Sequence, residues 1–218
     1  MNVFLLSVGV IAAYLIGAFP TSILYGRLKF GLDIREHGSG NAGATNTFRV
    51  LGKKAGSLVM AVDIFKGFLA TCIPFLFLYF DVIADGYQLV IWQIVCGIAA
   101  VVGHIFPVYE RFKGGKGVAS LLGMVLSLHT PAALVCIAIF LIVFLISKYV
   151  SLGSMLATLA FPIYFILSNP DQEPSHKVLT IFGFILFVLV AYTHKTNIKR
   201  LMRGEENKAN IKLRKSKD

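Results

Sequence analysis

The stretch that decides the fold runs from Gly117 to Lys148 and reads GVASLLGMVLSLHTPAALVCIAIFLIVFLISK. It holds no Asp, Glu, Lys or Arg before Lys148, and Pro131 interrupts it. A helix needs about 20 apolar residues to cross a bilayer, so the stretch is too long for one crossing and short for two. Its first part, Gly117–Leu128, would rise only about 18 Å as a helix. We expect one short helix here, followed by a longer helix over Pro131–Ser147.

The rest of the chain is also unusually apolar. Hydrophobic residues make up 56% of the 218 residues, charged residues only 15%, and the mean hydropathy is +0.75. This leaves too few polar residues to cover a soluble protein of ordinary build. The three cysteines, Cys72, Cys96 and Cys136, lie in apolar segments without metal-site or redox spacing, so we predict neither a metal nor another cofactor.

Apolar segments of spanning length recur on both sides of this stretch. They run approximately from Val3 to Tyr25, Gly56 to Phe80, Leu89 to Val108, Leu152 to Leu167 and Val178 to Tyr192. We therefore expect an all-α polytopic membrane protein, a single integral membrane domain over residues 1–218, with about seven transmembrane helices. The short one would follow a glycine-rich loop.

The charges predict the orientation. The net charge is +10, and Lys and Arg concentrate in the segments at about 26–55, 109–117 and 148–154 and in the tail at about 194–218. The other connections carry acidic Asp81, Asp85, Asp171 and Glu173 against Lys177. Counting the short helix as a crossing places every basic segment on one side. By the positive-inside rule that side is the cytoplasm, with the N-terminus outside and the tail inside.

The first polar loop, residues 33–49, reads DIREHGSGNAGATNTFR. Glycines let successive backbone N–H groups face a shared concavity that holds an anion, and an arginine can pair with a phosphate through two hydrogen bonds. The pattern predicts a phosphate site, and the alternative is a flexible solvated loop. The candidate residues are Gly38, Ser39, Gly40, Asn41, Gly43, Thr45, Asn46 and Arg49.

The second polar loop reads FKGGKGVAS over residues 112–120, at the start of the short helix. A helix N-terminus with free N–H groups favours an anion. Lys116 is followed by glycine and not by Ser or Thr, so the loop is no nucleotide-binding P-loop. A tight turn with orienting lysines is the alternative. The candidate residues are Lys113, Gly114, Gly115, Lys116 and Gly117.

Further candidates lie on the same side of the membrane. His194 and Asn197 would share one face of a helix after the last span. Ser151 and Ser154 lie at the short connection before the sixth predicted span. Inside the second span, Asp63 and Lys66 stand three residues apart, and we expect them to form a structural ion pair.

Four motifs, in order and over essentially the whole chain, resemble the bacterial acyl-phosphate:glycerol-3-phosphate acyltransferase family. They are GAFPTS (17–22), DIREHGSGNAGATN (33–46), GHIFP with FKGGKG (103–107 and 112–117), and HKTNIKR with GEENK (194–200 and 204–208). The resemblance implies a seven-helix bacterial inner-membrane enzyme whose active site faces the cytoplasm. It would transfer an acyl chain from acyl phosphate to the 1-hydroxyl of glycerol 3-phosphate, giving lysophosphatidic acid and inorganic phosphate, the first acylation of phospholipid biosynthesis.

The resemblance also implies which residues line the active site: Ser39, Asn41, Arg49, the Lys113–Gly117 loop, His194 and Asn197. We expect catalytic roles for Ser39, Arg49, Lys113, Lys116, His194 and Asn197, and substrate binding by the remaining candidates. Ala42 stands where the family often has proline, and Lys195 where arginine is commoner. The expected partners are the two substrates and membrane lipids, without nucleic acid.

Alternatives remain open at this point. A transporter of a phosphate-bearing solute could use the same glycines and basic residues, although transporters place polar groups near the bilayer midplane. A scaffold that binds anionic lipid would explain the charge but not the glycines. None of the five histidines has Asp five positions later, which argues against the acyltransferase class built on that pair. The attacking hydroxyl could pass its proton to His194 or to a substrate phosphate oxygen.

Overall fold

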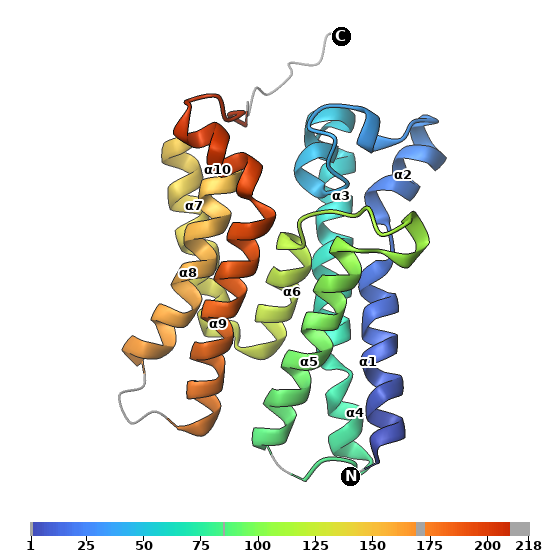
Figure 1. The fold of residues 1–218 in the computed structure, drawn as a ribbon, viewed down its shortest axis with the longest axis vertical. Helices are drawn as coiled ribbons and strands as arrows, with labels where there is room; N and C mark the ends of the chain where they lie inside the picture. The colour runs from blue at the N-terminus through green and yellow to red at the C-terminus, as the bar shows by residue number, and fades with distance from the viewer. Residues whose placement is uncertain (1, 85, 169–172, 210–218) are drawn as a thin grey trace.

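The structure is a computed structural model that describes residues 2–84, 86–168 and 173–209. In these ranges the regular structure is entirely helical (Figure 1). The α-helices are α1 (Val3–Ala18), α2 (Thr21–Phe30), α3 (Ala44–Cys72), α4 (Pro74–Tyr79), α5 (Gly86–Ile105), α6 (Val118–Leu128), α7 (Thr130–Ser147), α8 (Val150–Ser168), α9 (Pro174–Thr193) and α10 (Lys195–Met202), with short 3-10 turns η1 (Ile34–Glu36) and η2 (Val108–Glu110). Asp85, Asp171 and the tail beyond Ala209 lie outside the described residues.

The described residues contain 6 helical stretches that are long and apolar enough to cross a membrane. These are Val3–Phe30, Ala44–Tyr79, Gly86–Glu110, Thr130–Ser147, Val150–Ser168 and Pro174–Thr193. Between the third and fourth lies α6, an apolar helix of 11 residues. A short helix after the glycine loop, followed by a separate long one, is the arrangement that the sequence predicts.

The first two predicted segments differ in their boundaries. The predicted span from Val3 to Tyr25 is broken at Phe19 and Pro20, where α1 ends and α2 begins and continues to Phe30. The predicted loop at 26–55 is shorter in the structure, because α3 begins at Ala44. Gly52, at φ +85°, interrupts α3 and divides it at a kink, a backbone conformation that costs glycine little.

The helices form two bundles, α1–α6 and α7–α10, which lie side by side (Figure 1). In the first, α1 packs along α5 and α3 along α6; in the second, α8 packs between α7 and α9. Contacts of α6 with α7 and of α5 with α9 join the bundles. The N-terminus lies at one end of the molecule and α10 at the other (Figure 1).

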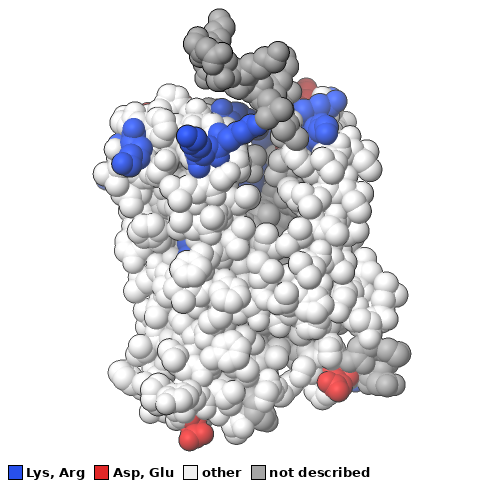
Figure 2. Space-filling model, turned by 180° about the vertical axis from the view of Figure 1, so that it is seen from behind, with Lys and Arg blue, Asp and Glu red and all other residues white. Residues whose placement is uncertain are grey.

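Charge follows the same axis. On the face in Figure 2, Lys and Arg gather at one end, and the opposite end carries Asp and Glu. We call the end that carries the 31–43 and 106–117 connections, the α7–α8 turn and α10 the basic end. This segregation agrees with the one-sided charge that the sequence predicts.

Glycines bring α3 and α6 into backbone contact. A Cβ atom on Gly67 would lie 2.0 Å from the carbonyl oxygen of Ser120, and one on Gly123 would lie 1.9 Å from that of Ile64. No larger side chain fits at either place without moving a helix. The contact fixes α6, and the loop before it, relative to α3.

The predicted pair of Asp63 and Lys66 is confirmed, with Lys66 Nζ 2.9 Å from Asp63 Oδ1 and both side chains buried. Thr21 Oγ1 donates to the same carboxylate oxygen at 3.0 Å, and Lys66 also donates to the Phe19 carbonyl at 2.9 Å. A buried charge is tolerated when it is paired and hydrogen-bonded. These bonds tie the break between α1 and α2 to α3.

Candidate active site

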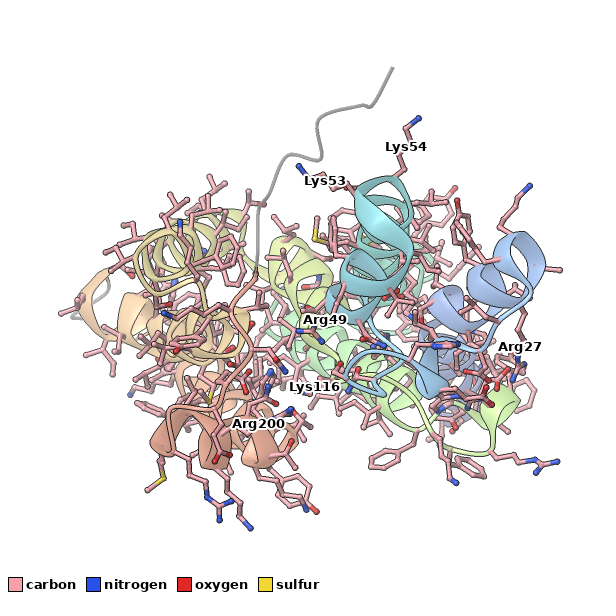
Figure 3. The ribbon with its side chains drawn as sticks, turned by 90° about the horizontal axis from the view of Figure 1, so that it is seen from above. Arg27, Arg49, Lys53, Lys54, Lys116 and Arg200 are labelled. Carbon is pink, nitrogen blue, oxygen red and sulfur yellow. The ribbon has the colours of Figure 1, made fainter. Side chains whose placement is uncertain are left out.

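Three basic side chains from three elements meet at the basic end. In the view from above, Arg49 of α3, Lys116 before α6 and Arg200 of α10 lie near the boundary between the bundles (Figure 3). Lys53 and Lys54 extend outward, and Arg27 lies away from the boundary, paired with Asp33 and Glu110. The charges of Arg49 and Arg200 both act on Lys116. Positive charges held close together in a partly enclosed place repel one another, and a bound anion relieves this repulsion. Such a cluster therefore favours the binding of an anion.

Lys116 connects the bundles. Its Nζ donates a hydrogen bond to Oδ1 of Asn197 on α10. Burial lowers the pKa of Lys116 to about 8; the nearby Glu206 carboxylate opposes this effect, while Arg200 and Arg49 add to it. A phosphate bound beside Lys116 would restore its charged form, because an opposite charge favours ionisation.

Glu206 holds this arrangement together. Its Oε1 accepts hydrogen bonds from Asn197 Nδ2 at 2.6 Å and from Ser151 Oγ at 2.9 Å, and its Oε2 lies 3.4 Å from Arg200 Nε. Glu206 has no predicted role of its own, because it lies in the predicted basic tail, although it falls within the GEENK motif at 204–208. The available signal was an acidic pair, Glu205 and Glu206, following Gly204 in an otherwise basic segment.

The segment after α10 therefore folds back onto the second bundle. Ala209 N donates to the carbonyl of Lys148 at 2.9 Å, and Lys208 Nζ lies over the Tyr149 ring, 5.7 Å from its centre. These contacts carry Glu206 to the α7–α8 turn. Ser151, at the start of α8, is thereby included in the site.

His194 lies at the junction of α9 and α10 and is 3% exposed. Its Nδ1 is 2.9 Å from the carbonyl oxygen of Val190. A carbonyl can only accept, so Nδ1 carries the hydrogen and Nε2 is left as an acceptor in the neutral ring. Burial, and then the Lys116 charge, lower the pKa of His194 to about 4. The ring is neutral near pH 7 and can accept a proton or a hydrogen bond.

Asn46 organises the first loop and is 1% exposed. Its Oδ1 accepts from Ser39 N at 2.8 Å and from Ser39 Oγ at 3.2 Å. Its Nδ2 donates to the carbonyls of Ile34 at 2.9 Å and His37 at 3.0 Å. The sequence predicts that Asn46 binds substrate. In the structure its side-chain amide instead forms hydrogen bonds within the loop and positions Ser39.

The other candidates of this loop differ in accessibility. Ser39, Thr45 and Arg49 are exposed, and Asn41 is half-buried. Gly38 and Gly40 have φ of +62° and +72°, values that favour glycine, and Gly43 caps α3. The loop can therefore present the Ser39 hydroxyl, the Asn41 amide and the Arg49 guanidinium to a ligand.

In the second loop, two glycines pack against the end of α5. Gly114 N donates to the Ile105 carbonyl and Gly115 N to the His104 carbonyl, each at 3.1 Å. A Cβ on Gly115 would lie 2.2 Å from His104 Nε2. Because these two N–H groups are already bonded to α5, they are not available to an anion. The N–H groups expected to bind an anion are then those of Lys116 and the start of α6.

The remaining candidate residues differ in whether they lie at the site. Gly117, at φ +80°, caps the N-terminus of α6. Lys113 is exposed, and its carbonyl accepts a long hydrogen bond from Arg35 Nη1 at 3.5 Å. Ser154 is 2% exposed and donates to the Val150 carbonyl of its own helix at 2.9 Å. Lys116, Gly117 and Ser151 thus belong to the site at the boundary between the bundles, and Ser154 supports α8.

Many known proteins are similar to this chain in sequence. The family model described as glycerol-3-phosphate acyltransferase matches residues 7–204. A glycerol-3-phosphate acyltransferase of Chlorobaculum tepidum is 42% identical over 91% of this chain and 94% of its own. One of Bacillus subtilis is also 42% identical, over 94% of this chain and 97% of its own.

The fold is shared with solved structures as well. A crystal structure of PlsY (YgiH), an integral membrane glycerol 3-phosphate acyltransferase, in its glycerol 3-phosphate form superposes with a TM-score of 0.80 at 37% identity, covering 94% of this chain and 95% of that one. The lysophosphatidic acid form gives a TM-score of 0.77. The chain therefore belongs to the glycerol-3-phosphate acyltransferase family.

Proposed function

We propose that this protein transfers an acyl chain from acyl phosphate to the 1-hydroxyl of glycerol 3-phosphate, giving lysophosphatidic acid and inorganic phosphate. The observation that carries the proposal is the meeting of Arg49, Lys116 and Arg200 at the end of a bundle of apolar helices. Both substrates carry phosphate and one carries a long apolar chain. The family, and the ligands named for the two PlsY structures, support this choice of substrates.

Binding would place phosphate groups against the basic side chains. Arg49, from the first loop, and Lys116, held by Asn197 and Glu206, bind phosphate by charge-assisted hydrogen bonds. The N-terminus of α6 adds a positive end of a helix dipole. Ser39, oriented by Asn46, supplies a further hydroxyl. The acyl chain remains among the apolar helices.

The chemistry needs no acyl-enzyme intermediate, because acyl phosphate is already activated. The 1-hydroxyl oxygen attacks the carbonyl carbon, a new ester bond forms, and the bond between that carbon and the bridging phosphate oxygen breaks. Positioning and charge stabilisation of the departing phosphate would supply most of the acceleration. The hydroxyl proton goes to His194 Nε2 or to a phosphate oxygen, two routes that the kinetics of His194 variants separate.

We further propose about seven crossings, with α6 as the short one. The basic end would face the cytoplasm of a bacterial cell, and the chain would form one domain in the inner membrane. Single cysteines placed at Lys53 and at Asp81, on opposite ends, in a background with Cys72, Cys96 and Cys136 replaced by alanine, test this orientation. A membrane-impermeant thiol reagent added to intact spheroplasts should label only the cysteine at position 81. Labelling of the cysteine at position 53 alone would show that the orientation is the reverse of the proposed one.

The function is tested by incubating the purified protein with acyl phosphate and glycerol 3-phosphate and following phosphate release. We expect release that requires both substrates. Arg49→Ala should lose most of this activity, while Lys177→Ala, at the opposite end, should retain it. If no such release occurs, the proposal fails. Uptake of labelled glycerol 3-phosphate into proteoliposomes, without product formation, would instead favour a transporter.

A further inference from the structure

The connection between α5 and α6 turns its carboxylate inward and its large apolar side chains outward. The Glu110 side chain is only 12% exposed and pairs with Arg27 at 2.8 Å and Arg35 at 2.9 Å. Its neighbours Tyr109 and Phe112 are 54% and 58% exposed. A connection surrounded by water would be expected to show the opposite pattern.

The start of this connection lies at the depth of the apolar helices. Tyr14 Oη donates to the carbonyl of Phe106 at 2.8 Å. Phe106 also lies within Gly86–Glu110, one of the helical stretches that are long and apolar enough to cross a membrane. Phe106 is 50% exposed at this level, where the surroundings of a membrane protein are lipid.

We call the exposed side chains of Phe106, Val108, Tyr109 and Phe112 the aromatic lip. The backbone beneath it is held closely: Phe112 N donates to the Pro107 carbonyl at 2.9 Å. Arg111 and Phe112 have φ of +53° and +60°. Such a conformation is unfavourable for a bulky residue and persists only where the surrounding structure enforces it. The outward direction of the lip is thus built into the fold.

We propose that the aromatic lip inserts into the interfacial layer of the bilayer at the basic end, with Arg111 and Lys113 at anionic lipid headgroups. Aromatic rings concentrate at this layer, and basic side chains beside them are attracted to anionic lipid. Both Arg111 and Lys113 are exposed and flank Phe112. The lip therefore fits a lipid surface with negative charge.

The lip also sets the depth of the phosphate site. Phe112 precedes Lys116 in the same short loop, and Arg35, which pairs with Glu110, donates to the Lys113 carbonyl. The lip and the loop are thus held as one unit. This consequence rests on the proposed function: an acyl donor carried in the bilayer presents its phosphate at headgroup depth, whereas glycerol 3-phosphate arrives from water.

The depth of the lip can be measured without any enzymatic assay. The chain has 1 tryptophan, Trp92, so Phe112→Trp in a Trp92→Phe background gives a single fluorescent reporter. The protein is reconstituted in vesicles of phosphatidylethanolamine and phosphatidylglycerol, with bromine on lipid chains close to the glycerol. We expect strong quenching by the brominated lipid and weak quenching by aqueous iodide.

Glu36→Trp in the same background is the matched control, since Glu36 is exposed in the first loop at the basic end; it should respond to iodide and not to bromine. If the Phe112→Trp protein responds as this control does, the proposal is overturned. Should the Trp92→Phe background fold poorly, a nitroxide on Phe112→Cys gives the same answer: access to oxygen supports insertion, and access to a water-soluble nickel chelate contradicts it.

A kinetic experiment tests the coupling to the phosphate site. In the same vesicles, the Tyr109→Ser and Phe112→Ser double variant should raise KM for acyl phosphate about fivefold and leave KM for glycerol 3-phosphate within about twofold. Phe80→Ser, an exposed aromatic at the opposite end, should change neither. An equal rise in both KM values, or none, would overturn the coupling. Lipid quenching with no acyl transfer would refute only the proposed function.

Discussion

Lys116 donates a hydrogen bond to Asn197, and this contact links the loop before α6 to α10, across the boundary between the two bundles. Glu206 holds Asn197 from the other side at 2.6 Å. Lys116 is consequently kept beside Arg49 and Arg200, although like charges repel. In the proposed function these side chains are therefore already in place before phosphate binds, which lowers the cost of ordering on binding.

The pH profile should report Lys116. With a pKa of about 8, Lys116 is charged below that pH and neutral above it. We expect kcat/KM for glycerol 3-phosphate to fall as pH rises through about 8, because the free enzyme loses a positive charge from its phosphate site. Lys116→Arg should remove this alkaline fall, since arginine stays charged. An unchanged profile in the arginine variant would assign the titration to another group.

Glu206→Gln should move the same titration. The Glu206 carboxylate raises the pKa of Lys116, so its neutralisation should lower that pKa and shift the alkaline fall of kcat/KM to lower pH. Glu205→Gln is the matched control, because Glu205 is an exposed neighbour. Loss of stability in Glu206→Gln with no shift of the profile would show a structural role alone.

His194→Ala should lower kcat by about 100-fold or more. The free Nε2 of the neutral ring interacts more strongly as the attacking hydroxyl loses its proton, so the loss appears in turnover. Steady-state kinetics with both substrates measure it. A variant with near-normal kcat and only a raised KM would exclude His194 as the base and leave a phosphate oxygen as the acceptor.

Asn46→Ala and Asn41→Ala should separate loop stability from substrate contact. The buried Asn46 amide makes bonds through both its oxygen and its nitrogen, and removing it leaves buried polar groups unpaired, at a cost of about 2–4 kcal/mol. Asn41 is half-buried, so its removal should reduce activity while stability stays within about 0.5 kcal/mol. Thermal unfolding in detergent and kinetics give the comparison; equal destabilisation would contradict it.

Asp63→Asn should destabilise the protein by about 3–5 kcal/mol, because it leaves the buried Lys66 without a counter-charge. The double variant Asp63→Asn with Lys66→Met removes both charges and should recover most of this loss. Unfolding measurements on the two variants are decisive. A double variant no more stable than the single one would mean that the polar contacts with Thr21 and Phe19, and not the pairing of charges, hold this region.

Apolar length and proline positions predicted most of the helices, because crossing a bilayer requires long uncharged segments. The short α6 was recognised from the length of Gly117–Leu128 and from Pro131. The break at Phe19 and Pro20 was missed, since the apolar pattern continues through it. Pro20 is the local signal for this break, because proline lacks the N–H that a continuous helix needs, and Lys66 donates to the Phe19 carbonyl there.

The candidate site residues were chosen by residue type, and their roles in catalysis stay predictions. Asn41 and Asn46 have the same chemistry, and only burial distinguishes the one that can meet substrate from the one that holds the loop. Gly114 and Gly115 look like a phosphate-binding nest, yet their distances to α5 show that they permit close packing. Glu206 was passed over because net charge described its segment as a basic tail.

The division of the site between the bundles has a consequence for how the protein is made. A growing chain that has completed α6 already contains Arg49 and Lys116, but 81 residues separate Lys116 from Asn197, and Glu206 comes later still. No shorter nascent chain can assemble the whole constellation. Enzymatic competence should therefore begin abruptly, only once translation has passed Glu206 and the second bundle has been inserted beside the first.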